Sequence, residues 1–361
     1  MSPRFPRTLR RPAASLAAFG LLLLIGCGEP SAPSGDTSAN LDSAAYALQG
    51  EVAIDGSSTV APISRAVAGE FGEHFRRVKV TVGVSGTGGG FQRFAQGGLD
   101  IAGASRPIKR DEFESCQKNG VEFLELPVAY DGLTIVVNPE NDWATQLTVD
   151  QLRLIYREDA AVKKWSELDP RWPAEEIHVY SPGHQSGTFD YFSEVMAKPG
   201  EKEVVLRKEM ATNEDDNVLV MGVARDKYAI GYFGASYYFN NRHQVKAVSI
   251  INPQTGAAVA PTPEAIERGD YAPFSRPLFI YVNVNSLKRP EVKRFVSFYL
   301  ANAQELARQV DYVGLSDDLQ APVRETYEAR LTGTHYLTPD GEKRIGGLPA
   351  IYTEANRYDG Q

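Results

Sequence analysis

Residues 52–91 read VAIDGSSTVAPISRAVAGEFGEHFRRVKVTVGVSGTGGGF, and the order of patterns in this stretch decides the fold class. From Ile63 to Phe71, apolar residues recur at helical spacing directly after a proline. From Val78 to Val84, a valine stands at every second position, which is typical of a strand with one buried face. The stretch therefore predicts strands that alternate with amphipathic helices, the pattern of an α/β architecture.

The same alternation continues along the chain. Residues 132–137 form a nearly continuous apolar run, which favours a strand buried on both faces. Thr148 and Gln151 have the spacing of a capping box at the start of a helix. Further helices are expected over residues 189–196, 216–224 and 290–310. No low-complexity linker divides this body, so two domains would require the chain to cross from one to the other and back, with ligands bound between them.

Composition narrows the classes of function. The chain has 361 residues, 42% hydrophobic and 23% charged, which is enough for two domains with sizeable cores. Lys and Arg number 38 against 46 Asp and Glu, so the net charge is -8 and nucleic-acid binding is not expected. Five histidines and two cysteines, without an HExxH or CxxC pattern, argue against a transition-metal enzyme. We expect neither a metal nor another cofactor.

The first 26 residues are typical of a signal peptide, because four arginines between residues 4 and 11 precede an apolar run. A transmembrane anchor is the weaker interpretation, since this run would barely span a bilayer. Residues 24–27, Leu-Ile-Gly-Cys, resemble the bacterial lipobox, which implies lipidation of Cys27. The alternative is a signal peptide with a chance cysteine. Residues 27–49 are expected to form a flexible tether, and cleavage lowers the net charge from -8 to -12.

Three loops rich in hydroxyl groups and glycine each stand just before an expected helix. They are DGSST at 55–59, SGTGGG at 85–90 and QSGT at 185–188. A helix N-terminus offers unpaired N–H groups and a partial positive charge, glycine lets a ligand approach the backbone, and Ser or Thr adds a donor. Together the loops predict a cage for an oxyanion. Taken singly, each loop could instead be only an N-cap.

Enzyme signatures fail on spacing at these loops. In residues 183–187, Gly-His-Gln-Ser-Gly, the serine comes one position late for the GxSxG elbow of hydrolases. Phe91 stands where the dinucleotide fingerprint needs its third small residue, and the loop before it lacks the lysine of a P-loop. His184 is only two residues from Ser186, so we expect it at the surface or at a cleft rim and not as a catalytic base.

Six short motifs follow one another along the body of the chain. They are DGSSTVAPI at 55–63, SGTGGGF at 85–91, DIAGASRPI at 100–108, SGTFDYF at 186–192, EDDNVLV at 214–220 and AIGYFG at 229–234. In this order they resemble the phosphate-binding proteins of bacterial phosphate ABC importers, PstS and its SphX-like relatives. Each motif is weak alone, but the combination is specific and covers the body from about Val52 to Tyr312.

The resemblance implies an α/β, two-lobed periplasmic-binding-protein fold of type II, with a ligand cleft between the lobes. Residues 50–129 and 276–345 would form a discontinuous first lobe, residues 130–275 a second lobe, and residues 346–361 a C-terminal tail. Carried over by position, the hydroxyl and backbone groups that bind phosphate are those of Ser58, Thr59, Thr87, Ser105, Ser186, Gly187 and Thr188.

The charged residues of the cage depart from the best-known members. Those have an aspartate after the Gly-Ala-Ser of the third motif, where this chain has Arg106, and an arginine four residues before the SGT serine, where it has Pro182. Arg106 would supply the cation, as in the SphX-like branch, with a surface ion pair as its alternative role. The acceptor for the phosphate proton is assigned to Asp216, or failing that to Asp215, with capping of the following helix as the alternative.

The resemblance implies a lipid-anchored solute-binding protein and not an enzyme. It would capture inorganic phosphate as its lobes close and deliver it to a membrane-embedded ABC permease. We expect a monomer in the cell envelope, held to a membrane by its lipid and facing the periplasm or the exterior. A phosphatase or phosphoryl-transfer enzyme that uses the same cage is the alternative from another class, and a phosphate-sensing surface protein is a third.

Overall fold

The computed structural model describes residues 48–159, 162–184, 186–198, 200–201, 204–310 and 312–360. The expected signal peptide, the lipidation site Cys27 and all but the last two residues of the expected tether lie outside the described residues. In the part of the chain that is described, no helix is both long enough and apolar enough to cross a membrane.

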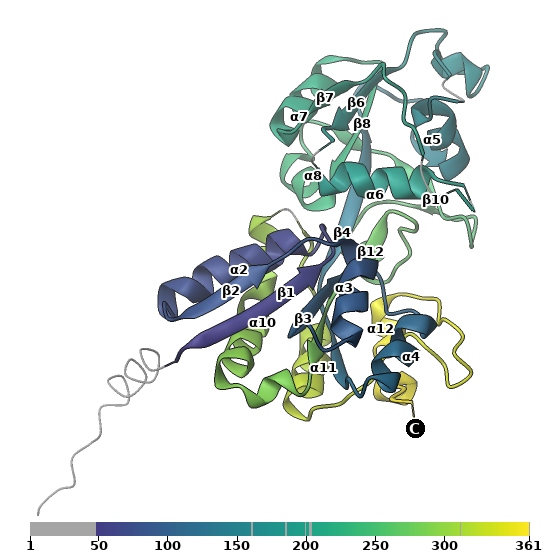
Figure 1. Ribbon diagram of the computed structural model, residues 1–361. Coiled ribbons are helices and arrows are strands. Elements are labelled where there is room, and N and C mark those ends of the chain that lie inside the picture. Colours follow the sequence, from purple (N-terminus) through teal and green to yellow (C-terminus); the bar gives the residue numbers. More distant parts are fainter. Residues whose placement is uncertain are drawn as a thin grey trace, which may run out of the picture. The chain divides into compact units, whose positions relative to one another are not determined.

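The strands form a large mixed sheet and a small one (Figure 1). The order in the large sheet is β2-β1-β3-β12-β4-β8-β6-β7, with β9 paired to β4. Its strands are β1 (Gly50–Gly56), β2 (Val78–Val82), β3 (Ile101–Ala104), β4 (Phe123–Val137), β6 (His178–Pro182), β7 (Ala211–Asn213), β8 (Ala229–Gly234), β9 (Lys246–Ala247) and β12 (Ser275–Asn283). The small sheet contains β5 (Gln146–Thr148), β10 (Ser249–Ile251) and β11 (Ala258–Val259).

Helices connect most of these strands. The α-helices are α2 (Ala61–His74), α3 (Gly86–Ala95), α4 (Arg110–Lys118), α5 (Val149–Tyr156), α6 (Gly187–Met196), α7 (Asp216–Arg225), α8 (Ala235–Asn241), α9 (Pro263–Glu267), α10 (Pro290–Gln309), α11 (Asp317–Glu328) and α12 (Leu348–Ile351). Short 3-10 helices cover Trp165–Glu167, Ser286–Lys288 and Glu354–Asn356. Every helix expected from the sequence is confirmed, and the capping box is formed: Thr148 N donates to Gln151 Oε1 (2.9 Å), and Gln151 N donates to Thr148 Oγ1 (3.1 Å).

Strand β4 belongs to both halves of the large sheet. Its residues 123–132 pair with β12, and its residues 133–137 pair with β8. On one side, β1 runs parallel to β2 and β3, and on the other, β6 runs parallel to β7 and β8. We call the group built on β1, β2 and β3, with α2, α3, α4 and α10, the first lobe. The group built on β6, β7 and β8, with α5 to α8, is the second lobe.

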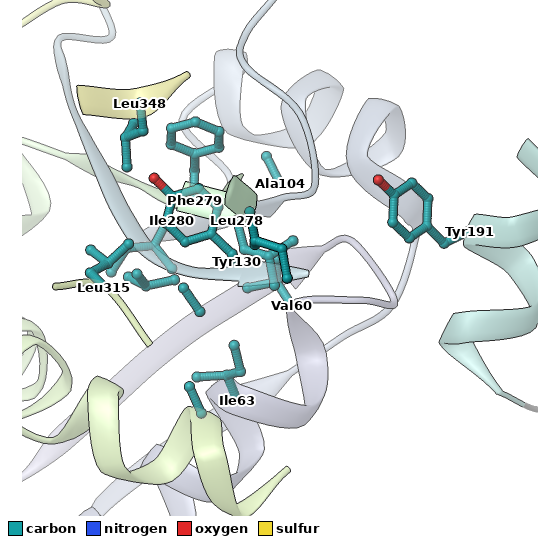
Figure 2. Close-up of a cluster of buried hydrophobic side chains, with 14 of the residues drawn as sticks. Val60, Ile63, Ala104, Tyr130, Tyr191, Leu278, Phe279, Ile280, Leu315 and Leu348 are labelled. Atoms are coloured by element: carbon teal, nitrogen blue, oxygen red, sulfur yellow. The ribbon is translucent and has the colours of Figure 1, made fainter. Parts of the chain in front are cut away.

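A continuous apolar core holds the first lobe together. Phe71 of α2 meets Phe295 of α10 edge to face, with 5.1 Å between the ring centroids. Figure 2 shows part of the core, in which Val60 and Ile63 at the start of α2 belong to the same cluster as Leu278 of β12. Because α2 is packed from its first turn onward, the loop between β1 and α2 has a fixed end.

The alternating valines predict a strand that runs to Val84, but the strand that forms is two residues shorter. Strand β2 ends at Val82, and Val84 is 48% exposed. The backbone turns at this point because Gly83 N donates to Ile54 O (2.8 Å) and Ser85 N donates to the Asp55 carboxylate (3.0 Å). These two bonds end the strand and start α3.

The C-terminal segment packs on the first lobe. Leu348, Ile351 and Tyr352 are buried in the main core cluster. The Tyr352 hydroxyl donates to the backbone oxygen of Glu125 in β4 at 2.8 Å. Tyr358 and Thr334 exchange backbone hydrogen bonds of 2.8 and 2.9 Å. These residues are therefore part of the folded body.

Candidate functional site

The candidate ligand loops lie at the carboxyl ends of parallel strands in both lobes. In the first lobe these are the loop after β1, the first turn of α3 after β2, and the loop after β3. In the second lobe they are the loops after β6 and β7, which lead into α6 and α7. Helices begin at this edge of a sheet, so their unpaired N–H groups and positive dipole ends face the place where ligands bind.

The hydroxyl groups of the loop after β1 do not cap the helix that follows. The N-cap residue of α2 is Val60, and no side chain accepts a hydrogen bond there. Instead, Thr59 N donates to Ser57 Oγ at 3.1 Å. Ser58 is exposed, whereas only 4% of Thr59 is exposed. Helix capping therefore does not account for the hydroxyl groups of this loop.

The glycine-rich motif forms the first turns of α3. Its N-cap, Ser85, makes no side-chain cap bond. Thr87 Oγ1 lies 3.2 Å from Ser105 Oγ and accepts a hydrogen bond from Ser105 N at 3.2 Å. A Cβ on Gly90 would lie 2.6 Å from the Cα of Gly56, so glycine is needed where α3 meets the end of β1. Two residues that the sequence places in separate motifs, Thr87 and Ser105, are thus in direct contact.

The Asp55 side chain links the loop after β1 to the start of α3. Its side chain is only 3% exposed and forms an ion pair with Arg93. One carboxylate oxygen, Oδ1, accepts from Gly56 N at 2.7 Å and from Ser85 N at 3.0 Å. A single buried carboxylate therefore sets the backbone at the start of both loops. Asp55 stands in the DGSSTVAPI motif, but nothing in that motif predicts this role.

Arg106 lies beside α3, and its guanidinium is already paired. It donates to both carboxylate oxygens of Glu112, at 2.8 and 2.7 Å, and stands 5.6 Å from the centre of the Phe91 ring. The Arg106 side chain is 31% exposed and that of Glu112 is 14% exposed. Burial opposes the charge of Arg106, but the hydrogen bond and Coulomb attraction of Glu112 outweigh it and raise the pKa of the guanidinium. The alternative role predicted for Arg106, an ion pair, is therefore observed with Glu112, and this pair is partly buried.

In the second lobe, the serine of the SGT motif does cap its helix. Ser186 Oγ accepts a hydrogen bond from Thr188 N at 3.2 Å at the start of α6. Ser186, Gly187 and Thr188 are all half-buried. The N-cap interpretation is confirmed for this loop, while a contact of these residues with a ligand stays a prediction.

Three acidic residues follow β7 at the same edge of the sheet. Asp215 is the N-cap of α7 and accepts from Asn217 N at 2.9 Å, so its capping role is observed. Asp216 is the first residue of α7 and is half-buried. A Cβ on Gly183 would lie 1.9 Å from Glu214 Oε1, which places the Glu214 carboxylate against the loop that leads to Ser186. Glu214 stands in the EDDNVLV motif, but nothing in that motif predicts this contact.

An arginine that no motif predicts connects the loop after β1 to helix α6. Arg276, on β12, donates to Thr59 Oγ1 at 3.1 Å and to the Asp131 carboxylate at 3.1 Å. It also donates to Glu194 on α6 at 2.7 Å. No local motif marks Arg276. Asp131 could have been noticed, because it is a lone carboxylate just before the apolar run at 132–137.

The donor set suits an oxyanion better than a cation. Hydroxyl groups and helix N-termini lie at the carboxyl ends of parallel strands in both lobes, and the guanidinium of Arg106 lies beside α3 in the first lobe. Within the described ranges, no group of three or more His, Cys, Asp or Glu is placed to hold a metal ion.

Comparisons with known proteins agree with this chemistry. A model of the PBP superfamily domain matches residues 31–303. Protein SphX from Synechococcus elongatus is 44% identical over 306 residues, 84% of this chain and 88% of the relative. The phosphate-binding protein PstS from Staphylococcus aureus (strain USA300) is 37% identical over 317 residues, 87% of this chain and 89% of the relative.

A solved structure shows the same fold. The crystal structure of a possible phosphate binding protein from Planctomyces limnophilus DSM 3776 has a TM-score of 0.75 and 43% identity, and the match covers 79% of this chain and all of that chain. The expected two-lobed α/β fold is thereby confirmed. The chain belongs to the PBP superfamily and, within it, to the PstS family of phosphate-binding proteins, in the branch that contains SphX.

Proposed function

We propose that this protein binds inorganic phosphate between its two lobes and delivers it to the permease of an ABC importer. The observation that carries the proposal is the placing of hydroxyl-bearing turns at the carboxyl edge of parallel strands in both lobes, in a family whose named members bind phosphate. The protein binds phosphate without a chemical reaction. The lobes close on the ligand, and the permease recognises the closed form. Its family consists of binding proteins and not enzymes.

The proposed ligand groups come from both lobes. The first lobe contributes Ser58, Thr59, Thr87, Ser105 and Arg106, and the second contributes Ser186, Gly187, Thr188 and Asp216. The N-terminal turns of α3 and α6 add backbone N–H groups with a partial positive charge. Because Glu112 already holds Arg106, the guanidinium is pre-oriented beside α3 and can offer only part of its fork to an anion.

The lobe boundaries are part of the proposal. We place the first lobe at residues 50–129 and 276–345 and the second at 130–275. The change of partner along β4, from β12 to β8 after residue 132, supports a crossing at this point. The return crossing falls at the start of β12, where Ser275 pairs with Gly132.

The N-terminal segment is proposed to place the protein in the cell envelope. We propose that residues 1–26 are removed, that Cys27 is lipidated, and that the monomeric body faces the periplasm or the exterior on a tether. Metabolic labelling with a palmitate analogue tests this assignment. Label in the wild-type chain that is lost in Cys27→Ser supports lipidation, and equal label in both contradicts it.

Calorimetry tests the central proposal. The described residues, from 48 onward, belong to one compact unit, so the chain from residue 28 onward is titrated with phosphate, sulfate, arsenate and molybdate. We expect saturable phosphate binding and a smaller radius of gyration in solution scattering with phosphate. Absence of phosphate binding contradicts the function. Turnover of an aryl phosphate would favour the enzyme alternative instead.

Asp216 is the proposed acceptor for the phosphate proton. Both phosphate and sulfate are tetrahedral anions, but only phosphate carries a proton near neutral pH, so a carboxylate in the site favours phosphate. Asp216→Asn should lower the ratio of phosphate to sulfate affinity and leave the fold intact. Competition between the two anions measures this ratio, with Asp215→Asn as the matched variant at the helix cap. An unchanged ratio in both variants means that another group accepts the hydrogen bond from the phosphate proton.

A further inference from the structure

Arg276 touches three separate elements with three different nitrogen atoms. Its Nε donates to Asp131 Oδ2 on β4 (3.1 Å), its Nη1 donates to Glu194 Oε2 on α6 (2.7 Å), and its Nη2 donates to Thr59 Oγ1 in the loop after β1 (3.1 Å). The guanidinium also stands 3.8 Å from the centre of the Tyr191 ring on α6, a residue labelled in Figure 2. The side chain thus joins a first-lobe ligand loop to the second-lobe helix that begins at the SGT motif.

Burial and charge hold this arrangement in place. The side chains of Arg276 and Asp131 are 14% and 5% exposed, whereas that of Glu194 is 64% exposed. Burial disfavours the charged form of Arg276, but the attraction of Asp131 and its other neighbours outweighs burial and raises the pKa of the guanidinium. Asp131 is the buried partner that fixes Arg276, and Glu194 is the exposed partner at the rim.

The contact with Thr59 determines what its hydroxyl can do. A hydroxyl group has one proton to donate and accepts through its lone pairs. Since Arg276 Nη2 has no lone pair to offer, Thr59 Oγ1 must accept in this pair, and its proton is left to point elsewhere. A cation on the accepting side also makes the hydroxyl a stronger donor.

We propose that Arg276 is a positioning residue for anion binding, which orients Thr59 Oγ1 as a donor and links the loop after β1 to helix α6. The inference rests on the proposed phosphate site, because Thr59 is one of its ligand groups. The positioning role of Arg276 differs from a merely structural role in one respect. Arg276 should affect phosphate affinity through the Thr59 hydroxyl, and not independently of it.

A double-mutant cycle tests this coupling. Phosphate dissociation constants are measured by calorimetry on the chain from residue 28 onward, for wild type, Arg276→Lys, Thr59→Val and the double variant. Arg276→Lys keeps the charge but loses the planar fork. We expect each single change to weaken phosphate binding about tenfold, as for loss of one hydrogen bond to a charged group. The double variant should bind no more weakly than Thr59→Val alone.

Two further variants act as matched controls. Thr59→Ser keeps the hydroxyl and should retain the sensitivity to Arg276→Lys. Glu194→Gln removes only the exposed partner and should change phosphate affinity by less than about threefold. If Arg276→Lys does not fold at the assay temperature, Asp131→Asn replaces it in the cycle, because this change removes the charge that holds Arg276 and keeps the side-chain size.

The outcomes separate the two proposals. If the wild type binds phosphate and the affinity loss of the double variant equals the product of the two single losses, the two residues act independently. This result overturns the positioning role of Arg276 and leaves the proposed function standing. Absence of phosphate binding by the wild type overturns the proposed function and this inference with it. Wild-type binding that each single change weakens, with no further loss in the double variant, supports both proposals, and single changes without effect overturn the positioning role.

Discussion

The two lobes use the hydroxyl groups of their candidate ligand loops differently. In the second lobe, Ser186 accepts a hydrogen bond from Thr188 N and so caps its own helix. In the first lobe, neither α2 nor α3 has a side-chain cap, and the hydroxyl groups contact other segments, as in the pair Thr87 and Ser105. The second-lobe loop is therefore held by local geometry, and the first-lobe loops are held by tertiary contacts. Substitutions in the first-lobe loops should for this reason change phosphate affinity or the free energy of unfolding more than substitutions in the second-lobe loop.

The largest expected effect on binding is at Arg106. Arg106→Ala should cost about 2 to 5 kcal/mol of phosphate binding, the range for truncating one partner of a buried charge pair. The change also leaves the Glu112 carboxylate, 14% exposed, without this partner beside the first-lobe loops, where it repels an anion. Calorimetry measures the effect, and Arg106→Lys should also bind weakly because a point charge cannot keep the bidentate pair with Glu112 and contact an anion as well. Near-normal affinity of Arg106→Ala would remove this residue from the site.

The next effect concerns stability and tests whether the first-lobe loops depend on a tertiary anchor. Asp55→Ala should lower the free energy of unfolding by about 2 to 3 kcal/mol, because it leaves two backbone N–H groups and Arg93 without their buried acceptor. Urea denaturation measures the change. A loss below about 0.5 kcal/mol, the usual range for a surface substitution, would show that the loops hold their shape without this carboxylate.

A smaller effect on stability should distinguish a hydroxyl group that caps a helix from one that does not. Ser186→Ala removes a helix cap and should lower the free energy of unfolding by about 1 kcal/mol. Ser58→Ala removes an exposed hydroxyl that caps no helix and should change it by less than about 0.5 kcal/mol. Both should weaken phosphate binding. Equal stability losses in the two variants would contradict the distinction between the lobes.

The smallest expected effect is a pH dependence that belongs to the second lobe. Hydrogen bonds from Arg157 lower the pKa of Glu201 from 4.5 to about 2. A lowered acid pKa stabilises the folded state at pH values above the unfolded pKa, and this contribution is lost as the pH falls from about 4.5 to about 2. Glu201→Gln should therefore reduce the loss of stability over that window. Urea midpoints at several pH values measure the slope, and identical slopes for both proteins would refute the assignment.

Several elements of the fold are predictable because their signals are local. The helix that begins after Thr148 is indicated by a capping box, and residues 132–137 of β4 are indicated by a nearly continuous apolar run. The end of β2 was missed because it depends on Asp55, which is distant in sequence and accepts a hydrogen bond from Ser85 N. A valine pattern contains no information about such a contact.

The motifs of the candidate site were also visible in the sequence, but the groups that position them were not. Hydroxyl groups and glycines mark the loops, so Thr87 and Ser186 could be assigned by position. Arg276 has no motif around it, and its partner Thr59 lies 217 residues away along the chain. Their contact exists only because β12 inserts between β3 and β4 in the sheet.

The sequence by itself determined the α/β class, several of the helices, the family and the loops that carry donors, because these depend on residue periodicity and on motifs of a few neighbouring residues. The tertiary structure alone decided which side chains already have partners, namely Arg106, which donates to Glu112, and Ser186, whose hydroxyl oxygen accepts from Thr188 N. It also decided that Asp55 and Arg276 hold the loops. The physical reason is that hydrogen bonds and ion pairs form between groups that are close in space, and strand order, not sequence distance, sets that closeness.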